Sequence, residues 1–153
     1  MGATVSIVIP TLRRPAGLAV ALRSVLAQSW RNIEVLVVDD ASTDGTARVI
    51  EGFAARDPRV RPMAQARNAG IYAARNLALG QARGDFVTVH DADDWMHPRR
   101  IETEVAAFAD PRLQAVESRW VRIDEGGRAP FLPYGMPVYA NPALMIYRAA
   151  ALR

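Results

Sequence analysis

The sequence of 153 residues contains no cysteine and no lysine. The absence of cysteine excludes disulfide bonds and thiolate metal sites, although it leaves the redox compartment undecided. No uninterrupted apolar run reaches the length of a membrane-spanning helix, and the N-terminus has no signal-peptide pattern. We therefore expect a cytoplasmic location, which includes the inner face of the membrane if regions outside this chain provide a peripheral attachment.

Because lysine is absent, all 19 basic residues are arginine, and the formal net charge is +3. The arginines occur singly or in pairs such as Arg13-Arg14 and Arg99-Arg100, not in a long run. A polybasic nucleic-acid-binding tail is therefore absent, and we expect no nucleic-acid partner. Two interpretations of the arginines remain open. Those near strand ends suit phosphate recognition, whereas a GC-rich bacterial genome favours arginine over lysine everywhere.

The apolar residues follow strand-like and helix-like spacing in turn. Short β-branched runs predict strands, and apolar positions at helical spacing predict helices between them. The predicted strands cover residues 5–9, 33–38, 60–63 and 86–89, and the predicted helices cover about 15–28, 46–55, 69–82 and 98–109. This alternation predicts an α/β fold with a mostly parallel sheet flanked by helices on both faces.

Beyond residue 113 the pattern changes. We expect strands at about 115–123 and 143–147, separated by a turn at 124–127 and a proline-rich stretch at 130–142. A further helix has barely begun at residue 153. We therefore expect a single domain that is a fragment of a longer one.

Three carboxylates in the segment Asp91-Ala92-Asp93-Asp94 directly follow the apolar run 86–89. They repel one another unless positive charge lies among them. Mg²⁺ or Mn²⁺ with oxygen ligands would supply that charge, and such ions commonly bind a substrate diphosphate as well. If the strand geometry continues, Asp91 and Asp93 point the same way. The alternative is a turn in which Asp94 caps the next helix.

Polar residues also follow the other predicted parallel strands, at 10–13, 39–42 and 65–70. Ligands of open α/β sheets bind outside the carboxyl ends of the strands, so we expect these loops to form one site. The first loop has neither Gly-x-Gly-x-x-Gly nor Gly-Lys-Ser/Thr, which argues against dinucleotide and P-loop sites. Asp40 would accept a hydrogen bond from the N–H of a pyrimidine base. The alternative is that Asp39 and Asp40 only cap the following turn.

In their order and spacing, four motifs together resemble glycosyltransferase family 2. They are Ser6-Ile7-Val8-Ile9-Pro10-Thr11, residues 37–46 (VVDDASTDGT), Asn68-Ala69-Gly70 with Ala74-Arg75-Asn76, and Asp91-Ala92-Asp93-Asp94-Trp95 with Pro98. The resemblance covers about residues 4–109. It implies the GT-A fold, a Rossmann-like nucleotide-diphospho-sugar transferase fold, here incomplete at the C-terminal side. Residues 1–112 would form the donor-binding part and residues 113–153 the start of the acceptor-side part.

The resemblance implies a metal-dependent inverting transfer of a sugar from a nucleotide-diphosphate donor to an acceptor hydroxyl. A UDP-sugar is the expected donor, and a glycan or lipid-linked molecule is the expected acceptor, in polysaccharide or cell-surface glycan synthesis. One alternative is a non-catalytic nucleotide-sugar-binding module of a larger protein. Another is a sugar nucleotidyltransferase, which would need a glycine-rich loop after the first strand, and residues 11–14 contain no glycine.

The resemblance also implies roles for individual residues. Asp93 would bind Mn²⁺ or Mg²⁺ directly, and Asp91 would contact the ribose or a metal-bound water, as the second residue of the metal site. Arg75 would lie near the donor phosphates or sugar; the alternative is a solvated helix arginine. Asp40 would contact the base edge. The remaining residues expected in the nucleotide-sugar site are Pro10, Thr11, Leu12, Arg13, Asn68, Gly70 and Ala92.

Two departures from the family pattern affect these expectations. Leu12 and Arg13 stand where the family usually has an aromatic residue and an asparagine, so base stacking would be weaker. The family's general base is an aspartate far downstream of the metal motif, and we expect it beyond Arg153. The chain alone is therefore expected to bind donor with little or no transfer. We expect Trp95 to anchor its loop to the core, with stacking on an acceptor sugar as the alternative.

Overall fold

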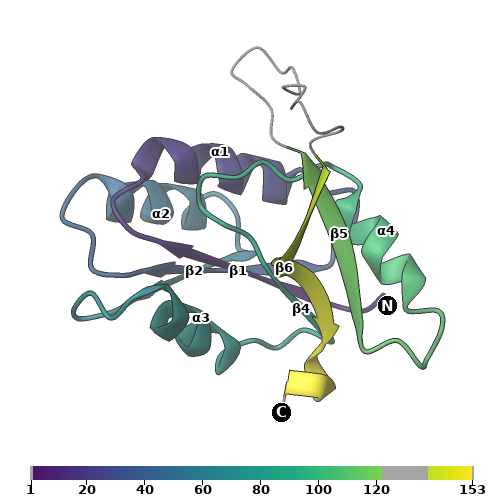
Figure 1. The fold of residues 1–153 in the computed structure, drawn as a ribbon. Coiled ribbons are helices and arrows are strands. Elements are labelled where there is room, and N and C mark those ends of the chain that lie inside the picture. Colours follow the sequence, from purple (N-terminus) through teal and green to yellow (C-terminus); the bar gives the residue numbers. More distant parts are fainter. Residues whose placement is uncertain (1, 122–137, 153) are drawn as a thin grey trace, which may run out of the picture.

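The computed structural model describes residues 2–121 and 138–152 of the chain. Its elements alternate along the first two thirds of the sequence, as the pattern predicts (Figure 1). The elements are β1 (Val5–Thr11), α1 (Pro15–Leu26), β2 (Ile33–Asp39), α2 (Thr46–Ala54), β3 (Val60–Ala64), α3 (Ile71–Leu79), β4 (Phe86–Val89), α4 (Arg100–Ala107), β5 (Ala115–Val121), β6 (Val138–Arg148) and a short 3₁₀ helix (Ala149–Leu152).

The strands form one six-stranded sheet in the order β3-β2-β1-β4-β6-β5. Strands β1 to β4 are parallel, whereas β6 is antiparallel to both β4 and β5. Helices α1 and α2 cover one face of the sheet, and α3 covers the other (Figure 1). The predicted α/β fold with a mostly parallel sheet and helices on both faces is confirmed. No helix in the described part of the chain is long and apolar enough to cross a membrane.

Side chains of β1 show how the sequence builds two cores. Ile7 and Ile9 face the larger core beneath α1 and α2, together with Leu22 of α1. Val8 points to the opposite face and packs with Ala74 of α3. Side chains alternate along a strand, so a run of apolar residues without polar interruption belongs to a strand buried on both faces.

Pro10 does not end the first strand, contrary to the expected bounds of 5–9. β1 continues to Thr11 and pairs there with β2 alone, since its pairing with β4 stops at Val8. The carbonyl of Thr11 accepts a hydrogen bond from Asp40 N on the β2 side, so Pro10, one residue earlier, faces the β4 side. Because no strand pairs with β1 there, the missing N–H of Pro10 removes no ladder hydrogen bond.

The last strand is longer than predicted. β6 begins at Val138, not at 143, and its pairing with β5 shifts register between Glu117 and Arg119. Pro142 lies in that irregular stretch, where a strand tolerates proline, and it hid the strand in the sequence. The turn expected at 124–127, and the end of the strand expected at 115–123, lie outside the described residues.

The order of the strands creates a place for a ligand. From β1 the chain moves to β2 and β3 on one side, and it then crosses back to β4 on the other side. The two neighbouring strands β1 and β4 therefore lead into loops that diverge at their carboxyl ends. This is a topological switch point, where open α/β sheets bind their ligands.

Candidate functional site

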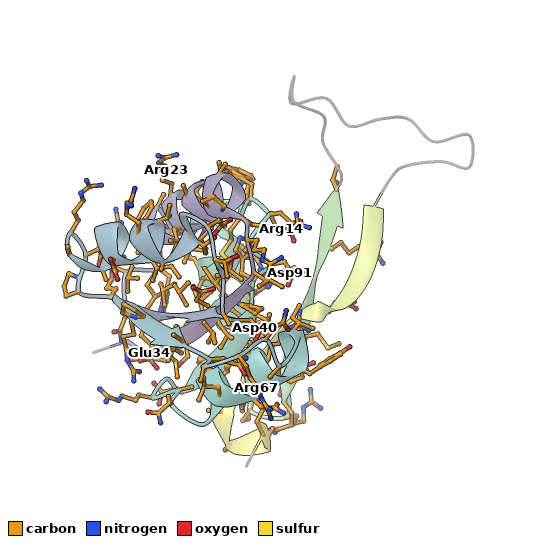
Figure 2. The ribbon with its side chains drawn as sticks, turned by 90° about the vertical axis from the view of Figure 1, so that its left-hand side faces the viewer. Arg14, Arg23, Glu34, Asp40, Arg67 and Asp91 are labelled. Carbon is orange, nitrogen blue, oxygen red and sulfur yellow. The ribbon has the colours of Figure 1, made fainter. Side chains whose placement is uncertain are left out.

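A cavity of about 420 Å³ lies at the carboxyl ends of the parallel strands. Its walls come from the loops after β1, β2 and β4 and from the loop that leads into α3. Figure 2 shows Arg14, Asp91 and Asp40 along this side of the molecule, between helices α1 and α3. The lining residues are Pro10, Thr11, Leu12, Arg14, Asp40, Asn68, Gly70, Ile71, Ala74, Asp91, Ala92 and Asp93.

Most of the predicted site residues line this cavity, and two do not. Neither Arg13 nor Arg75 is a lining residue, although Arg75 binds Asp91, which is one. Three further residues, Arg14, Ile71 and Ala74, line the cavity without having been predicted from the sequence. The signal for Ile71 and Ala74 was available, because both lie on the first turn of the helix that follows the polar loop. Arg14 offered no such signal beyond its place after the first strand.

The loops after β1 and β2 are tied to each other. The backbone N–H of Arg13 donates to Oγ of Ser42 (2.9 Å), and Asp40 N donates to the carbonyl of Thr11 (2.9 Å). Arg13 (φ 51°) and Ala41 (φ 61°) both adopt the left-handed conformation, which is uncommon for residues other than glycine. The side chain of Thr11 is buried, and its hydroxyl has no hydrogen-bond partner within residues 2–121 and 138–152.

The two aspartates after β2 have different tasks. Oδ1 of Asp39 accepts the backbone N–H of Ser42 (3.0 Å), which is the turn-capping role considered for it. The buried carboxylate of Asp40 accepts two backbone N–H groups, from Ala69 (2.8 Å) and Gly70 (2.9 Å). It thereby fixes the start of α3 against β2. A carboxylate offers about four lone-pair directions, so Asp40 keeps acceptor capacity toward the cavity.

The acidic loop does not continue the strand. β4 ends at Val89, and the residues that follow form a turn, so the strand alternation does not explain why Asp91 and Asp93 share the cavity. Asp94 does not cap α4, whose N-cap residue is Arg99 and has no side-chain cap. The capping alternative for this motif is therefore wrong.

Of the three carboxylates that line the cavity, the two in the acidic loop, Asp91 and Asp93, are each paired with an arginine. Nη1 of Arg14 donates to Oδ2 of Asp93 (2.6 Å), and Nη2 of Arg75 donates to Oδ1 of Asp91 (3.0 Å). The pKa of Asp94 is raised, first by partial desolvation of its carboxyl group and then by the negative charges of Asp91 and Asp93. The loop therefore concentrates negative charge that attracts cations.

The donor set suits a metal that is shared with a substrate. In the described part of the chain, no three His, Cys, Asp or Glu side chains are grouped so as to hold a metal. Mg²⁺ needs no such group when one or two carboxylates and a substrate diphosphate complete its shell. Asp91 and Asp93 both line the cavity and both already bind a positive group. These residues fit a divalent cation that arrives with an anionic ligand.

The loop after the acidic motif is anchored by Met96, not by Trp95. Met96 is buried, and its N–H donates to Oγ of Ser24 (3.0 Å). The side chain of Gln28 donates to the carbonyl of His97 (2.8 Å) and accepts the N–H of Ile101 (3.1 Å). Trp95 is 54% exposed, so the expectation that it anchors the loop is wrong. The buried polar bonds to α1 do this instead.

The first turn of α1 touches the acidic loop from the other side. A Cβ atom on Gly17 would lie 3.1 Å from the carbonyl of Ala92 and 3.5 Å from Cα of Asp93. Glycine allows this approach without a shift of the neighbouring backbone. The helix therefore holds its N-terminal end, which carries partial positive charge, close to Asp93.

His90 lies directly beneath the site. It is buried, and neither ring nitrogen has a hydrogen-bond partner among the residues that the structure describes. Burial, helped by the positive charge of Arg100, lowers the pKa of His90 to about 4. The imidazole is therefore neutral at pH 7, and its burial is that of a packing residue.

Comparison with known proteins gives a consistent result. The family model described as "Glycosyl transferase family 2" matches residues 6–150. The chain is 30% identical over 125 residues to "Glycosyltransferase GlyG" of Streptococcus pneumoniae, and the match covers 82% of the chain. It is 33% identical over 141 residues to "Chondroitin synthase" of Escherichia coli, with 92% of the chain covered.

Solved structures show the same similarity in three dimensions. The structure of S. aureus TarS 1-349 in complex with UDP matches with a TM-score of 0.79 and 25% identity over 97% of the chain. The mannosyltransferase PcManGT from Pyrobaculum calidifontis, in complex with GDP-Man and Mn²⁺, matches with a TM-score of 0.74 and 26% identity over 94% of the chain. The predicted GT-A fold is confirmed.

The chain is short relative to these proteins. It spans 42% of the length of the pneumococcal protein and 20% of the chondroitin synthase. It spans 48% of the TarS structure and 44% of the mannosyltransferase structure.

Proposed function

This chain belongs to glycosyltransferase family 2, and on that premise we propose that its cavity binds a nucleotide-diphosphate sugar for transfer to an acceptor hydroxyl. The observation that carries the proposal is the convergence of four loops on one cavity, with three aspartates and an arginine in its wall. A glycosyltransferase in glycan synthesis is the broad function that its relatives support. The finer statements below concern donor, metal and residue roles.

The nucleoside part of the donor would lie against the loops after β1 and β2. Pro10, Thr11 and Leu12 supply an apolar wall with one hydroxyl, that of Thr11, which has no hydrogen-bond partner among the described residues. Asp40 would accept a hydrogen bond from the N–H of the base with its remaining lone pairs. At the same time it holds the segment Asn68-Ala69-Gly70 through the N–H groups of Ala69 and Gly70. Leu12 offers less stacking surface than an aromatic residue, so the base would be held mainly by hydrogen bonds.

The diphosphate would lie near the acidic loop. Asp93 and Asp91 would hold a divalent cation there, and Arg75 would keep Asp91 oriented through their hydrogen bond (3.0 Å). When bound, such a cation neutralises the negative charge that develops on the leaving diphosphate. Mn²⁺ in the related mannosyltransferase structure supports a divalent cation, and either Mn²⁺ or Mg²⁺ meets the requirement.

The transfer step itself needs an acceptor hydroxyl that attacks the anomeric carbon. The bond from this carbon to the diphosphate oxygen breaks, the new glycosidic bond forms on the opposite side, and a base takes the hydroxyl proton. We predict that an aspartate outside this chain is that base. A cytoplasmic location and a glycan or lipid-linked acceptor also stay predictions.

The first experiment is a calorimetric titration of the chain with UDP, GDP and dTDP, each with Mn²⁺, with Mg²⁺ and with EDTA. We expect UDP to bind in the presence of metal and to lose most of its affinity in EDTA. UDP in the TarS structure supports this choice. Failure of all three nucleotides to bind would contradict the proposal, whereas preference for GDP would revise only the donor.

The Asp93→Ala variant gives the second experiment. We expect metal-dependent UDP binding to fall by about 100-fold or more, because even partners of metal ligands typically contribute 10- to 100-fold. The fold would stay intact, since the Asp93 side chain is half exposed. Undiminished metal-dependent binding would remove Asp93 from the site. The matched control is Asp110→Asn, a partly exposed aspartate that pairs with the exposed Arg112 and does not line the cavity.

A non-catalytic nucleotide-sugar-binding module is the second candidate. The departures at Leu12 and Arg13 favour it, because they alter the loop that lines the base pocket. Transfer of sugar to a glycan acceptor by the full-length protein would exclude it. Donor binding without transfer or donor hydrolysis in that protein would support it.

A further inference from the structure

Arg14 occupies the position beside Asp93 where the proposed function requires a metal ion. Its Nη1 lies 2.6 Å from Oδ2 of Asp93, and both residues line the cavity. No other hydrogen bond of this guanidinium occurs among residues 2–121 and 138–152. The carboxylate expected to hold the metal is thus already neutralised by a side chain of the same chain.

This ion pair contributes little to the stability of the fold. The side chains of Arg14 and Asp93 are 60% and 50% exposed. Exposed ion pairs typically contribute about 0.2–1 kcal/mol, because water screens the charges and two long side chains lose freedom. A ligand with a higher charge can therefore displace the guanidinium at small cost.

The backbone beneath the pair is held firmly, in contrast to the exposed side chains. The carbonyl of Arg14 accepts the N–H of Leu18 (2.9 Å), which fixes Arg14 at the start of α1. Gly17 lets this turn contact the backbone of Ala92 and Asp93. A change of partner by Arg14 therefore needs rotation of its side chain and no movement of the loops.

Arg75 behaves differently from Arg14. Its side chain is only 16% exposed, and its guanidinium carbon Cζ lies over the ring of Tyr72, 5.8 Å from the ring centroid. Its pairing partner Asp91 is also less exposed than Asp93. Arg75 is therefore built into the wall as a fixed support, whereas Arg14 is the exposed and replaceable partner.

We propose that Arg14 is an internal substitute for the divalent cation at Asp93, and that it turns to the donor diphosphate when the cation binds. In the metal-free protein the guanidinium neutralises Asp93 and reduces the repulsion between the carboxylates of the acidic loop. After exchange, the same guanidinium meets the diphosphate, for which its planar donor fork is suited. Arg14 thus competes with the metal for Asp93 and strengthens binding of the nucleotide through its diphosphate. This inference rests on the proposed function.

The two roles predict changes of opposite sign in the Arg14→Gln variant. Mn²⁺ alone should bind more tightly, by about 1.5- to 5-fold, because a competing ion pair worth 0.2–1 kcal/mol is lost. UDP in saturating Mn²⁺ should bind about 10-fold more weakly, since a charge-assisted hydrogen bond to phosphate is lost. A structural defect would weaken both affinities together.

The experiment measures Mn²⁺ affinity by electron paramagnetic resonance of the free ion and UDP affinity by calorimetry, both on the 153-residue chain. Arg112→Gln is the matched control, because it removes one arginine from an exposed pair with Asp110 (2.7 Å) far from the cavity. It should leave both affinities unchanged. Arg14→Lys should restore part of the UDP affinity, since it keeps the charge without the planar fork.

Three outcomes separate the possible errors. Unchanged affinities for Mn²⁺ and UDP in Arg14→Gln would overturn the inference, provided that the wild-type chain binds both. Weaker binding of both ligands would also overturn it, because Arg14 would then support the site and not compete with the metal. If the wild-type chain binds no nucleotide with any metal, the proposed function itself fails.

Discussion

The amino ends and the carboxyl ends of the parallel strands differ in how completely their polar side chains are hydrogen-bonded. At the amino ends, which we call the amino rim, Ser6, Glu34, Arg61, Arg83 and Gly84 form a closed network. Glu34 accepts hydrogen bonds from Oγ of Ser6 (2.6 Å) and from the backbone N–H of Arg83 (2.6 Å), and it pairs with Arg61. Ser6 Oγ in turn accepts the N–H of Gly84 (2.9 Å).

The carboxyl ends, which we call the carboxyl rim, carry Thr11, Asp40, Arg75, Asp91 and Asp93. Here the hydroxyl of Thr11 and Nε of Arg75 are buried without partners in the described part of the chain. In Figure 2, Glu34 lies at the lower left, apart from Asp91 and Arg14.

The pKa values express the same difference. Burial alone would raise the pKa of Glu34, but hydrogen bonds from Ser6, Arg83 and Arg61 hold it below its usual value. The pKa of Asp94 on the opposite rim is raised by partial desolvation and by its acidic neighbours. The polar groups of the amino rim hydrogen-bond to one another and stabilise the fold. The carboxyl rim still has polar groups that can bind a ligand. Changes at the amino rim should therefore affect folding, and changes at the carboxyl rim should affect binding first.

The largest effect on stability is expected from Gly84→Ala at the amino rim. A Cβ atom there would lie 2.7 Å from Ser6 N and 2.8 Å from the carbonyl of Phe86, and backbone cannot yield as a side chain can. We expect a loss of about 3 kcal/mol in the free energy of unfolding, measured by urea denaturation. Gly52→Ala in α2, with no atom within 4 Å, should instead gain about 0.5–1 kcal/mol. Equal effects in the two variants would contradict the clash.

His90 predicts a pH dependence at the carboxyl rim. Its pKa falls from 6.5 in the unfolded chain to about 4 in the folded chain. Between these two pH values, His90 is therefore protonated in the unfolded chain and neutral in the folded chain. Stability should therefore decrease as the pH falls from 6.5 to 4, by about 3 kcal/mol from this residue. His90→Leu should remove that part of the slope in unfolding experiments with EDTA. A slope that survives would assign the pH dependence to another group.

Asp40→Asn tests whether a binding residue of the carboxyl rim also supports the fold. Asparagine can accept only one of the two N–H groups from Ala69 and Gly70, so we expect a loss of about 2 kcal/mol. Hydrogen exchange at these two amides should accelerate more than elsewhere. Asp110→Asn should change stability by less than about 0.5 kcal/mol, because its pair with Arg112 is exposed. Uniform acceleration would point to global and not local loosening.

The smallest effect is expected from Arg13→Asn. Arg13 has φ 51°, a left-handed conformation that asparagine adopts more readily. The variant should gain about 0.5–1 kcal/mol in thermal unfolding. Arg56→Asn, which has no positive φ, should show no gain. If UDP affinity falls as stability rises in Arg13→Asn, the arginine side chain contributes to binding. That result would explain why a strained residue is retained.

Local chemistry allowed much of this site to be predicted from the sequence. Strand ends followed by Thr11, Asp40 and Asp91 predict one cavity because parallel strands bring their carboxyl ends together. The pairing of Arg14 with Asp93 could not be predicted, since an exposed arginine has no periodic signal and its partner lies 79 residues away. The exposure of Trp95 was missed because the neighbouring Met96 makes the buried contact.

Bounds of the elements were less predictable where proline intervened. Pro142 hid the first part of β6, because a register shift that tolerates proline is a property of two paired strands and not of one segment. The helix predicted at 69–82 is shortened to Ile71–Leu79, since Gly70 (φ 90°) lies outside helical geometry. Both errors arise from contacts or backbone angles that a single stretch of sequence does not specify.

Pro10 has a consequence for the mouth of the cavity. Two neighbouring strands with free backbone groups tend to extend their ladder, and β1 and the chain after β4 diverge only at the mouth of the cavity. Pro10 lacks the N–H that the next rung would use on that side. The β1–β4 ladder therefore cannot gain this hydrogen bond across the mouth of the cavity. A pyrrolidine ring near the end of β1 thus helps to keep the carboxyl ends of β1 and β4 apart.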